Sequence, residues 1–335
     1  MHIQLSAHFR DLSILVIGDI MLDTYIWGKA ERLSPEAPVP VVEVLQRTSS
    51  PGGAANVAMN LQSLGARPIL CSVTGADARG DELLRLIESQ GIGTQGILRT
   101  PDRTTTTKFR IIANKTQLLR VDEEVNTPLP QELSRLLWQK IEHLIQKEHP
   151  AAIVFQDYDK GVITSYLIEE TITLAQKEGI LVCVDPKRRN FMAYREVTLF
   201  KPNLKEFREG LGTPRDLLGH FDLLEQEMRG FQEMMQCKIL MVTLSDKGMA
   251  LRYEEEGQWK FHLLPAEVRK VADVSGAGDT VISVAALGLA AGFSPLETAR
   301  LANLAGGLVC EEVGVVPVDL QKLQKEYNQL HSEEK

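Results

Sequence analysis

The sequence predicts an α/β protein, with a three-layer core of helices around a mostly parallel sheet and a small β lid beside it. Short β-branched runs alternate with segments of helical length. These runs are apolar on both faces, as in strands that helices cover on both sides. The predicted strands are 14–17, 69–73, 153–155, 181–184, 199–201 and 239–243.

Two segments lack the helical period and interrupt this alternation. Residues 23–48 contain three prolines and the alternating run 39–44, and residues 104–121 open with a threonine run that favours extended structure. We expect the two segments to form one small sheet over an end of the core, which is the shape of a lid.

Helices are predicted where apolar residues recur at helical spacing. Leucines and isoleucines within 131–147 indicate an amphipathic surface helix, and the apolar run 281–291 indicates a buried one. Ser294, Pro295 and Glu297 have the spacing of a capping box, so a further helix begins there.

Length and composition fit a large globular core. At 335 residues and 44% hydrophobic content, the chain can bury such a core, although length alone allows one domain or two. We interpret residues 1–330 as a single domain and residues 331–335 as a C-terminal tail.

Charge and hydropathy exclude several classes of partner. The formal net charge is −8 and the charges are interspersed, so no basic stripe suggests nucleic acid or an anionic membrane. Residues 1–10 lack the apolar stretch of a signal peptide, and the run 281–291 is too short to cross a bilayer. The four cysteines lie far apart in or beside apolar runs, which is typical of buried thiols in a reducing compartment. We therefore expect a soluble, cytoplasmic protein.

The segment most informative about function is 273–280, DVSGAGDT, directly before the buried helix. A glycine-rich turn at a helix start presents backbone N–H groups and the positive end of the helix dipole, and both attract a phosphate. Asp279 lies beside that position, and phosphoryl transfer needs a carboxylate to accept the proton of the incoming hydroxyl. On these residues alone, helix capping by Asp279 is an equal alternative. The chain contains no Gly-Lys-Ser/Thr of a P-loop and no His-Arg-Asp loop, so the nucleotide is held in another way.

Segments spread over nearly the whole chain resemble the ribokinase/PfkB carbohydrate kinases. Residues 273–280 resemble the C-terminal signature of that family, 51–58 (PGGAANVA) its di-glycine motif and 203–206 (NLKE) its Asn-x-x-Glu. Two further segments agree in order and spacing: Gly18-Asp19 followed by Asp23, and 243–248 (TLSDKG). The resemblance implies a ribokinase-like fold and an ATP-dependent sugar kinase.

The resemblance also implies roles for individual residues. Asp279 would be the catalytic base, and the γ-phosphate would bind the N–H groups of Gly276, Ala277 and Gly278. The nucleotide would contact Asn203, Glu206, Thr243, Ser245, Gly248 and Ser275. Glu206 would bind Mg²⁺ through water, and Asp273 would lie at a monovalent-cation site for K⁺. Because the helix dipole favours the ionised carboxylate, we expect Asp279 to be a weak base.

A longer string resembles one branch of the family. Residues 32–42 (RLSPEAPVPVV), together with 51–60 and 185–187, are similar to the kinases that phosphorylate D-glycero-β-D-manno-heptose 7-phosphate at O1. The implied product is the 1,7-bisphosphate used for ADP-heptose and cell-surface glycans. By this resemblance the sugar phosphate would contact Asp23, Gly52, Gly53, Asn56, Lys108, Arg120, Asp122 and Lys187. It also implies a homodimer with the lid at its interface and, since the chain has no His-x-Gly-His, a separate nucleotidyltransferase.

Two departures from the family pattern put the substrate in doubt. Ser275 stands where the family usually has threonine, and 156–161 (QDYDKG) has Gln156 and Asp159 where a serine and a small residue are expected. Another sugar, sugar phosphate or nucleoside is therefore an alternative substrate, and a non-catalytic nucleotide-binding module is a second alternative. A Rossmann oxidoreductase ranks last, because Gly18-Asp19 is not a Gly-x-Gly-x-x-Gly turn.

Overall fold

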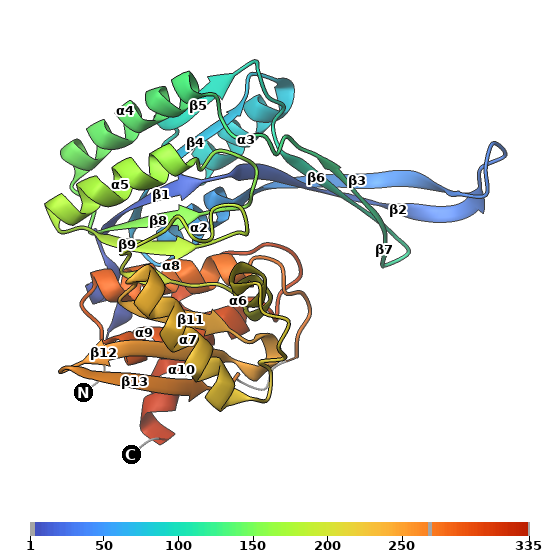
Figure 1. Ribbon diagram of the computed structural model, residues 1–335. Coiled ribbons are helices and arrows are strands. Elements are labelled where there is room, and N and C mark those ends of the chain that lie inside the picture. Colours follow the sequence, from blue (N-terminus) through green and yellow to red (C-terminus); the bar gives the residue numbers. More distant parts are fainter. Residues whose placement is uncertain (1–3, 267–269, 334–335) are drawn as a thin grey trace.

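The computed structural model describes residues 4–266 and 270–333, and its larger sheet confirms the α/β prediction (Figure 1). The order of this sheet is β13 (Gln258–Leu264), β12 (Met249–Glu255), β11 (Ile239–Thr243), β10 (Leu199–Phe200), β9 (Leu181–Asp185), β8 (Ala152–Gln156), β1 (Ser13–Gly18), β4 (Arg67–Gly75) and β5 (Gly96–Thr100). Its pairs are parallel except β11 with β12 and β12 with β13. Each predicted strand lies in this sheet.

A second sheet projects from the first, and its order is β3 (Pro40–Gly53), β2 (Ile20–Leu33), β6 (Thr107–Ala113) and β7 (Thr116–Glu123). The β2–β3 hairpin extends far from the core in Figure 1. Its root is buried at Leu22, whereas Leu33 near its tip is 65% exposed. The strands come from the two segments in which the sequence analysis expected a lid.

Helices cover both faces of the nine-stranded sheet, and the side chains of β1 show how. Ile14 and Val16 belong to one buried cluster, and Leu15 and Ile17 belong to the other. The helices of the first cluster are α1 (Leu5–Phe9), α2 (Ala54–Ser63), α3 (Ala78–Ser89), α8 (Ala277–Ala290), α9 (Pro295–Val309) and α10 (Leu320–Glu333). Those of the second are α4 (Gln131–Glu148), α5 (Ser165–Glu178), α6 (Leu204–Leu211) and α7 (Phe221–Met235).

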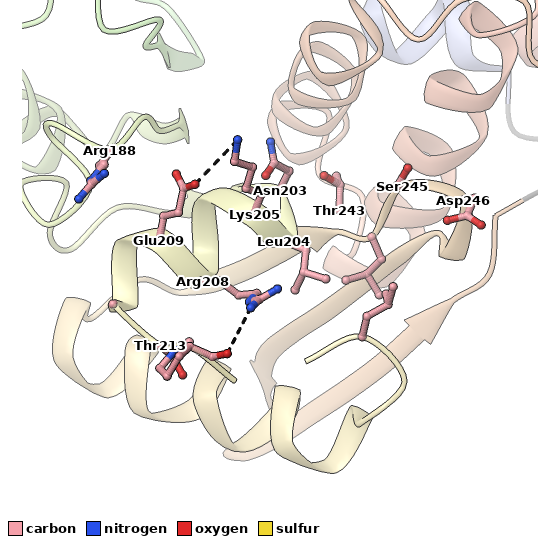
Figure 2. Close-up of a pocket in the computed structure, with 14 residues that line it drawn as sticks. Arg188, Asn203, Leu204, Lys205, Arg208, Glu209, Thr213, Thr243, Ser245 and Asp246 are labelled. Carbon is pink, nitrogen blue, oxygen red and sulfur yellow. Dashed lines mark hydrogen bonds and ion pairs between the residues drawn. The ribbon is translucent and has the colours of Figure 1, made fainter. Parts of the chain in front are cut away.

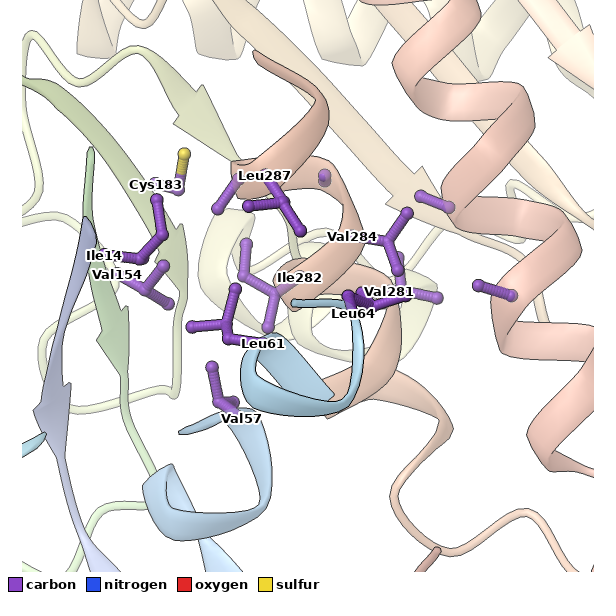
Figure 3. Close-up of a cluster of buried hydrophobic side chains, with 14 of the residues drawn as sticks. Ile14, Val57, Leu61, Leu64, Val154, Cys183, Val281, Ile282, Val284 and Leu287 are labelled. Atoms are coloured by element: carbon purple, nitrogen blue, oxygen red, sulfur yellow. The ribbon is translucent and has the colours of Figure 1, made fainter. Parts of the chain in front are cut away.

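The two helices that reach the candidate site, α2 and α8, pack directly against the sheet. Figure 3 shows Leu61 of α2 and Ile282 of α8 facing Ile14 of β1, and all three side chains are fully buried. Because small residues such as Ala55 and Ala286 line the buried faces of these helices, their backbones can approach closely. In the part of the chain that the structure describes, no helix is long and apolar enough to cross a bilayer.

Candidate active site

The start of α8 places Asp279 at the carboxyl ends of the parallel strands. Gly276 precedes the helix with a φ of +81°, a left-handed conformation that glycine adopts without strain. A β-carbon there would also lie 2.9 Å from Asn56 Nδ2, so a larger residue would crowd α2. Asp279 follows in the first turn and its side chain is buried. The carboxyl edge of such a sheet is where α/β proteins usually bind ligands.

Three donors from different parts of the fold hold the Asp279 carboxylate. Tyr158 donates its hydroxyl to Oδ1 at 2.7 Å, and Gln156 Nε2 donates to the same oxygen at 3.1 Å. Asn56 Nδ2 donates to Oδ2 at 2.8 Å. Asp279 is therefore not simply a helix cap, because its carboxylate oxygens accept hydrogen bonds from side chains of α2 and of the segment at the end of β8. Of these donors, only Asn56 was predicted to belong to the site.

Burial changes the acidity of Asp279. Burial and, to a smaller extent, the nearby Asp185 carboxylate raise the pKa of this carboxyl, and they outweigh the hydrogen bonds from Tyr158 and Asn56 and the charge of Lys187. The resulting pKa is about 6. The expectation of a weak base was therefore wrong, since loss of hydration outweighs the helix dipole. With a pKa near neutrality, Asp279 is ionised at pH 7 and is still able to take up a proton.

A buried ion pair lies next to the start of α8. Lys201 Nζ is 3.0 Å from Asp185 Oδ2, and both side chains are almost fully buried. A β-carbon on Gly278 would lie 3.9 Å from Lys201 Nζ, so the lysine faces the phosphate-binding turn that the sequence predicted. Sequence reasoning missed Lys201 because it treated residues 199–201 as an apolar strand. The signal was a cation at the end of that run, directly before the Asn-x-x-Glu segment.

Asn203 and Glu206 form a capping box at the start of α6. Asn203 Oδ1 accepts from the Glu206 N–H at 2.8 Å, and Glu206 Oε2 accepts from the Asn203 N–H at 2.8 Å. Glu206 also pairs with Lys187 through Oε1. Lys187, predicted to contact the sugar, thus lies between Glu206 and Asp185, where its Nζ is 3.8 Å from Asp185 Oδ1. These two carboxylates outweigh its burial and raise the pKa of Lys187.

A pocket of about 930 Å³ opens beside this capping box (Figure 2). Its lining includes Asn203, Thr243 and Ser245, the basic side chains of Arg188, Lys205 and Arg208, and the acidic side chains of Glu209 and Asp246. An isolated parallel β-bridge joins Thr243 to Asn203. Ser245 has a φ of +58°, in a turn where the Gly248 N–H donates to the Ser245 carbonyl. Of the predicted nucleotide-binding residues, Asn203, Thr243 and Ser245 thus line one concave site of ligand size, whereas Glu206, Gly248 and Ser275 are not part of its lining.

The substrate-facing predictions divide into two groups. Asp23 of β2 is buried and pairs with Arg110 of β6. Gly52 is paired with Met21 on the neighbouring strand, and a β-carbon on Gly52 would be 2.2 Å from Asp23 Oδ2, so only glycine leaves this carboxylate in place. Gly53 ends β3 and precedes α2, the helix that carries Asn56.

Lys108, Arg120 and Asp122 form the second group, on β6 and β7 of the projecting sheet. Asp122 accepts two hydrogen bonds of 3.0 Å from Arg120 and pairs with Lys108 Nζ at 3.3 Å. Lys108 also lies 3.5 Å from Glu124. These three side chains thus contact one another and Glu124, at a different place from Asp279 and its donors.

Asp273 stabilises the turn before α8. It accepts hydrogen bonds from the N–H groups of Ser275 at 2.9 Å and Gly314 at 3.1 Å. Although burial raises the pKa of Asp273, these bonds lower it more, so the carboxyl stays ionised. Among the described residues, no cluster of three or more His, Cys, Asp or Glu side chains could hold a metal ion.

The segment that departs from the family pattern has a defined turn. Asp159 adopts a φ of +57°, which explains why a small residue is expected there. Asp19, at the end of β1, accepts from the N–H groups of Tyr158, Lys160 and Val162 at 2.9, 3.2 and 3.0 Å. This turn delivers Gln156 and Tyr158 to Asp279.

A buried carboxylate in the first turn of a helix that a glycine precedes, together with a pocket of ligand size, is the arrangement expected of a kinase that phosphorylates an alcohol. The sequence profile of the pfkB family carbohydrate kinases matches residues 11–322, and the chain belongs to this family. It is therefore a sugar kinase with a ribokinase-like fold.

Curated relatives carry the name bifunctional protein HldE. The chain is 39% identical to the one from Magnetococcus marinus over 317 residues, which is 94% of this chain and 64% of the relative. It is 39% identical to the Helicobacter pylori protein over 318 residues, or 95% and 67% of the two chains. This chain thus spans about two thirds of the length of these relatives.

Solved structures with the same fold are more distant in sequence. Phosphofructokinase-2 from Escherichia coli in complex with potassium superposes with a TM-score of 0.77 at 19% identity, covering 96% of this chain and 99% of the other. Ribokinase from Arabidopsis thaliana complexed with ribose and ATP superposes with a TM-score of 0.70 at 18% identity, covering 94% and 99%.

Proposed function

We propose that this chain transfers the γ-phosphate of ATP to O1 of D-glycero-β-D-manno-heptose 7-phosphate, giving the 1,7-bisphosphate used for ADP-heptose. The observation that carries the catalytic part is Asp279, buried at the start of α8 with a pKa of about 6. The string 32–42 supports the heptose substrate.

In this proposal Asp279 accepts the proton of the sugar hydroxyl as the oxygen attacks the phosphate. The N–H groups at the start of α8 would hold the transferred group, and Lys201 and Lys187 would offset its negative charge. Asn56, Gln156 and Tyr158 fix the carboxylate before substrate arrives, so little reorganisation is needed during the reaction.

The residues beside the capping box fit a magnesium ion. Asp185 Oδ1 is buried and has no hydrogen-bond partner among the described residues, and the Glu206 carboxylate lies on the other side of Lys187. Carboxylate oxygens, with waters between, are the ligands that Mg²⁺ prefers. When bound, the ion would neutralise charge on the phosphates.

The sugar phosphate would lie between the projecting sheet and α2. Asp23, held by Arg110, would accept hydrogen bonds from sugar hydroxyls, and Gly52 leaves room for it. Lys108 and Arg120 of the second group would face the 7-phosphate. Arginine suits this role because its planar fork can meet two phosphate oxygens.

A coupled ADP-release assay tests the proposed substrate. Heptose 7-phosphate should give the highest kcat/KM in a panel that also contains ribose, ribose 5-phosphate, fructose 6-phosphate and a nucleoside. A higher value for another acceptor would replace the heptose assignment and leave the kinase assignment intact. ATP binding without ADP release on any acceptor would instead indicate a non-catalytic module.

We predict an acidic limb near pH 6 in the pH profile of kcat/KM. The base must be deprotonated, so activity should rise as the pH passes the Asp279 pKa of about 6 and then level off. An aspartate with an ordinary pKa would give a limb near pH 4. The second ionisation of a phosphate also lies near pH 6, so the residual activity of Asp279→Asn is the control. A limb that persists unchanged in this variant belongs to the substrate and contradicts the assignment.

We also propose a homodimer formed through the projecting sheet. Leu33, Val44 and Leu45 of the hairpin and Leu119 of β7 are large apolar side chains exposed on this sheet. Burying them against a second copy would remove apolar area from water. Sedimentation should give about twice 37.3 kDa, and Leu45→Glu should shift it toward the monomer, whereas Leu263→Glu on β13 should not. A monomeric wild-type chain at micromolar concentration would refute the dimer.

A further inference from the structure

The two oxygens of the Asp279 carboxylate have unequal surroundings. Oδ1 accepts two hydrogen bonds, at 2.7 Å from the Tyr158 hydroxyl and at 3.1 Å from Gln156 Nε2. Oδ2 accepts one, at 2.8 Å from Asn56 Nδ2. An ionised carboxylate has about four acceptor sites, two on each oxygen. Counting donors from the described residues, both sites on Oδ1 are filled and one on Oδ2 remains.

The donors to Oδ1 come from one rigid turn. Gln156 ends β8, and Tyr158 follows where Asp19 accepts three backbone N–H groups, including that of Tyr158 at 2.9 Å. Lys187 Nζ lies over the Tyr158 ring, 5.3 Å from its centre, which is a favourable position for a cation–π contact. The hydroxyl of Tyr158 therefore has little freedom to leave Asp279.

Gln156 makes a second link that a serine at this position would lack. Its Nε2 also donates to Asp185 Oδ2 at 3.3 Å, while it donates to Asp279 Oδ1. The two hydrogens of one amide group can thus serve two buried carboxylates, whereas a serine hydroxyl has a single hydrogen. The departure from the family pattern at Gln156 gives Asp279 a donor that is also anchored to the Asp185–Lys201 pair.

We propose that Tyr158 and Gln156 are positioning residues that hold Oδ1 of Asp279, so that Oδ2 deprotonates the sugar hydroxyl. This inference rests on the proposed kinase function and adds which oxygen acts and which residues orient it. The hydroxyl proton passes to Oδ2 while the sugar oxygen bonds to the γ-phosphorus. The bond between that phosphorus and the bridging oxygen of ADP breaks, and ADP leaves with the bonding electrons.

Tyr158→Phe and Gln156→Met test the proposal, because each removes a donor to Oδ1 and keeps most of the side-chain volume. Each should lower kcat by roughly 10- to 100-fold through loss of alignment, with little change in the KM for ATP. The acidic limb of kcat/KM should move to higher pH in Tyr158→Phe, because the Tyr158 hydrogen bond lowers the Asp279 pKa in the wild type. It should also move to higher pH in Gln156→Met, because loss of a donor to a carboxylate disfavours its ionised form. A purely structural defect would lower activity without moving this limb.

Tyr194→Phe is the matched control, because the Tyr194 hydroxyl is also buried and donates to a different carboxylate, Asp157, at the same 2.7 Å. This variant should leave the acidic limb where the wild type has it. Unfolding curves identify a variant that fails to fold. If either Tyr158→Phe or Gln156→Met fails to fold, the pH profile of the remaining one tests the proposal. If wild-type turnover is present and neither variant moves the limb, the donor pair is refuted and the kinase function stands. If the wild type phosphorylates no acceptor, both the positioning role of Tyr158 and Gln156 and the proposed kinase function are refuted.

Discussion

Asp279→Asn should lower kcat by about 10²- to 10⁴-fold, the usual range for a lost general base. The amide keeps the size of the side chain but cannot accept the sugar proton. Because α8 still presents its N–H groups and the pocket beside α6 does not involve Asp279, ATP binding should persist. Single-turnover kinetics and calorimetric ATP titration measure the two quantities separately.

Asp81→Asn provides the control for helix capping. Asp81 also lies in the first turn of a helix, α3, and pairs with Arg99 at 2.6 Å on the surface. If Asp279 only stabilised the start of α8, both substitutions would leave kcat close to that of the wild type. Near-normal turnover by Asp279→Asn would thus remove the base assignment.

Lys201→Met should destabilise the fold by about 3–5 kcal/mol, as expected when one partner of a buried ion pair is removed. Lys201 and Asp185 are 2% and 5% exposed, so the remaining carboxylate would be charged without its close partner in a site that water barely reaches. Urea unfolding followed by circular dichroism gives the difference directly.

Lys205→Met is a matched control four residues further along the chain. Lys205 pairs with Glu209 at 3.8 Å and its side chain is 82% exposed, so its loss should change the free energy of unfolding by no more than about 0.5 kcal/mol. Equal unfolding midpoints for the two variants would show that the Lys201–Asp185 pair does not stabilise the fold.

The core was predictable because its signals are local. Residues 14–17 are apolar on both faces, and β1 indeed contributes to both buried clusters. Strands β12 and β13, which form an antiparallel hairpin, were missed because Arg252 and Lys260 interrupt their apolar runs. Their pairing depends on tertiary contacts with β11 that no local pattern reveals.

The position of Asp279 was predictable, but its chemistry was not. A glycine-rich turn before an apolar helix is visible in the sequence, and so is the carboxylate that follows it. Its acidity depends on burial and on the hydrogen bond from Tyr158, which reaches it only after β8 pairs with β1. The sequence predicted that Lys187 contacts the sugar phosphate. Its ion pair with Glu206 could not be predicted, because only the folded chain brings the two side chains together.

The hydrogen bonds around Asp279 also bear on how the protein is made. Its donors lie 121, 123 and 223 residues earlier in the chain. At a synthesis rate of about 5–20 residues per second, the ribosome needs on the order of ten seconds or more to add the residues between Asn56 and Asp279. Through that interval Asn56 has been synthesised and the Asp279 carboxylate has not. Catalytic competence is therefore acquired late in folding, and recovery of turnover after dilution from denaturant would report the final long-range closure.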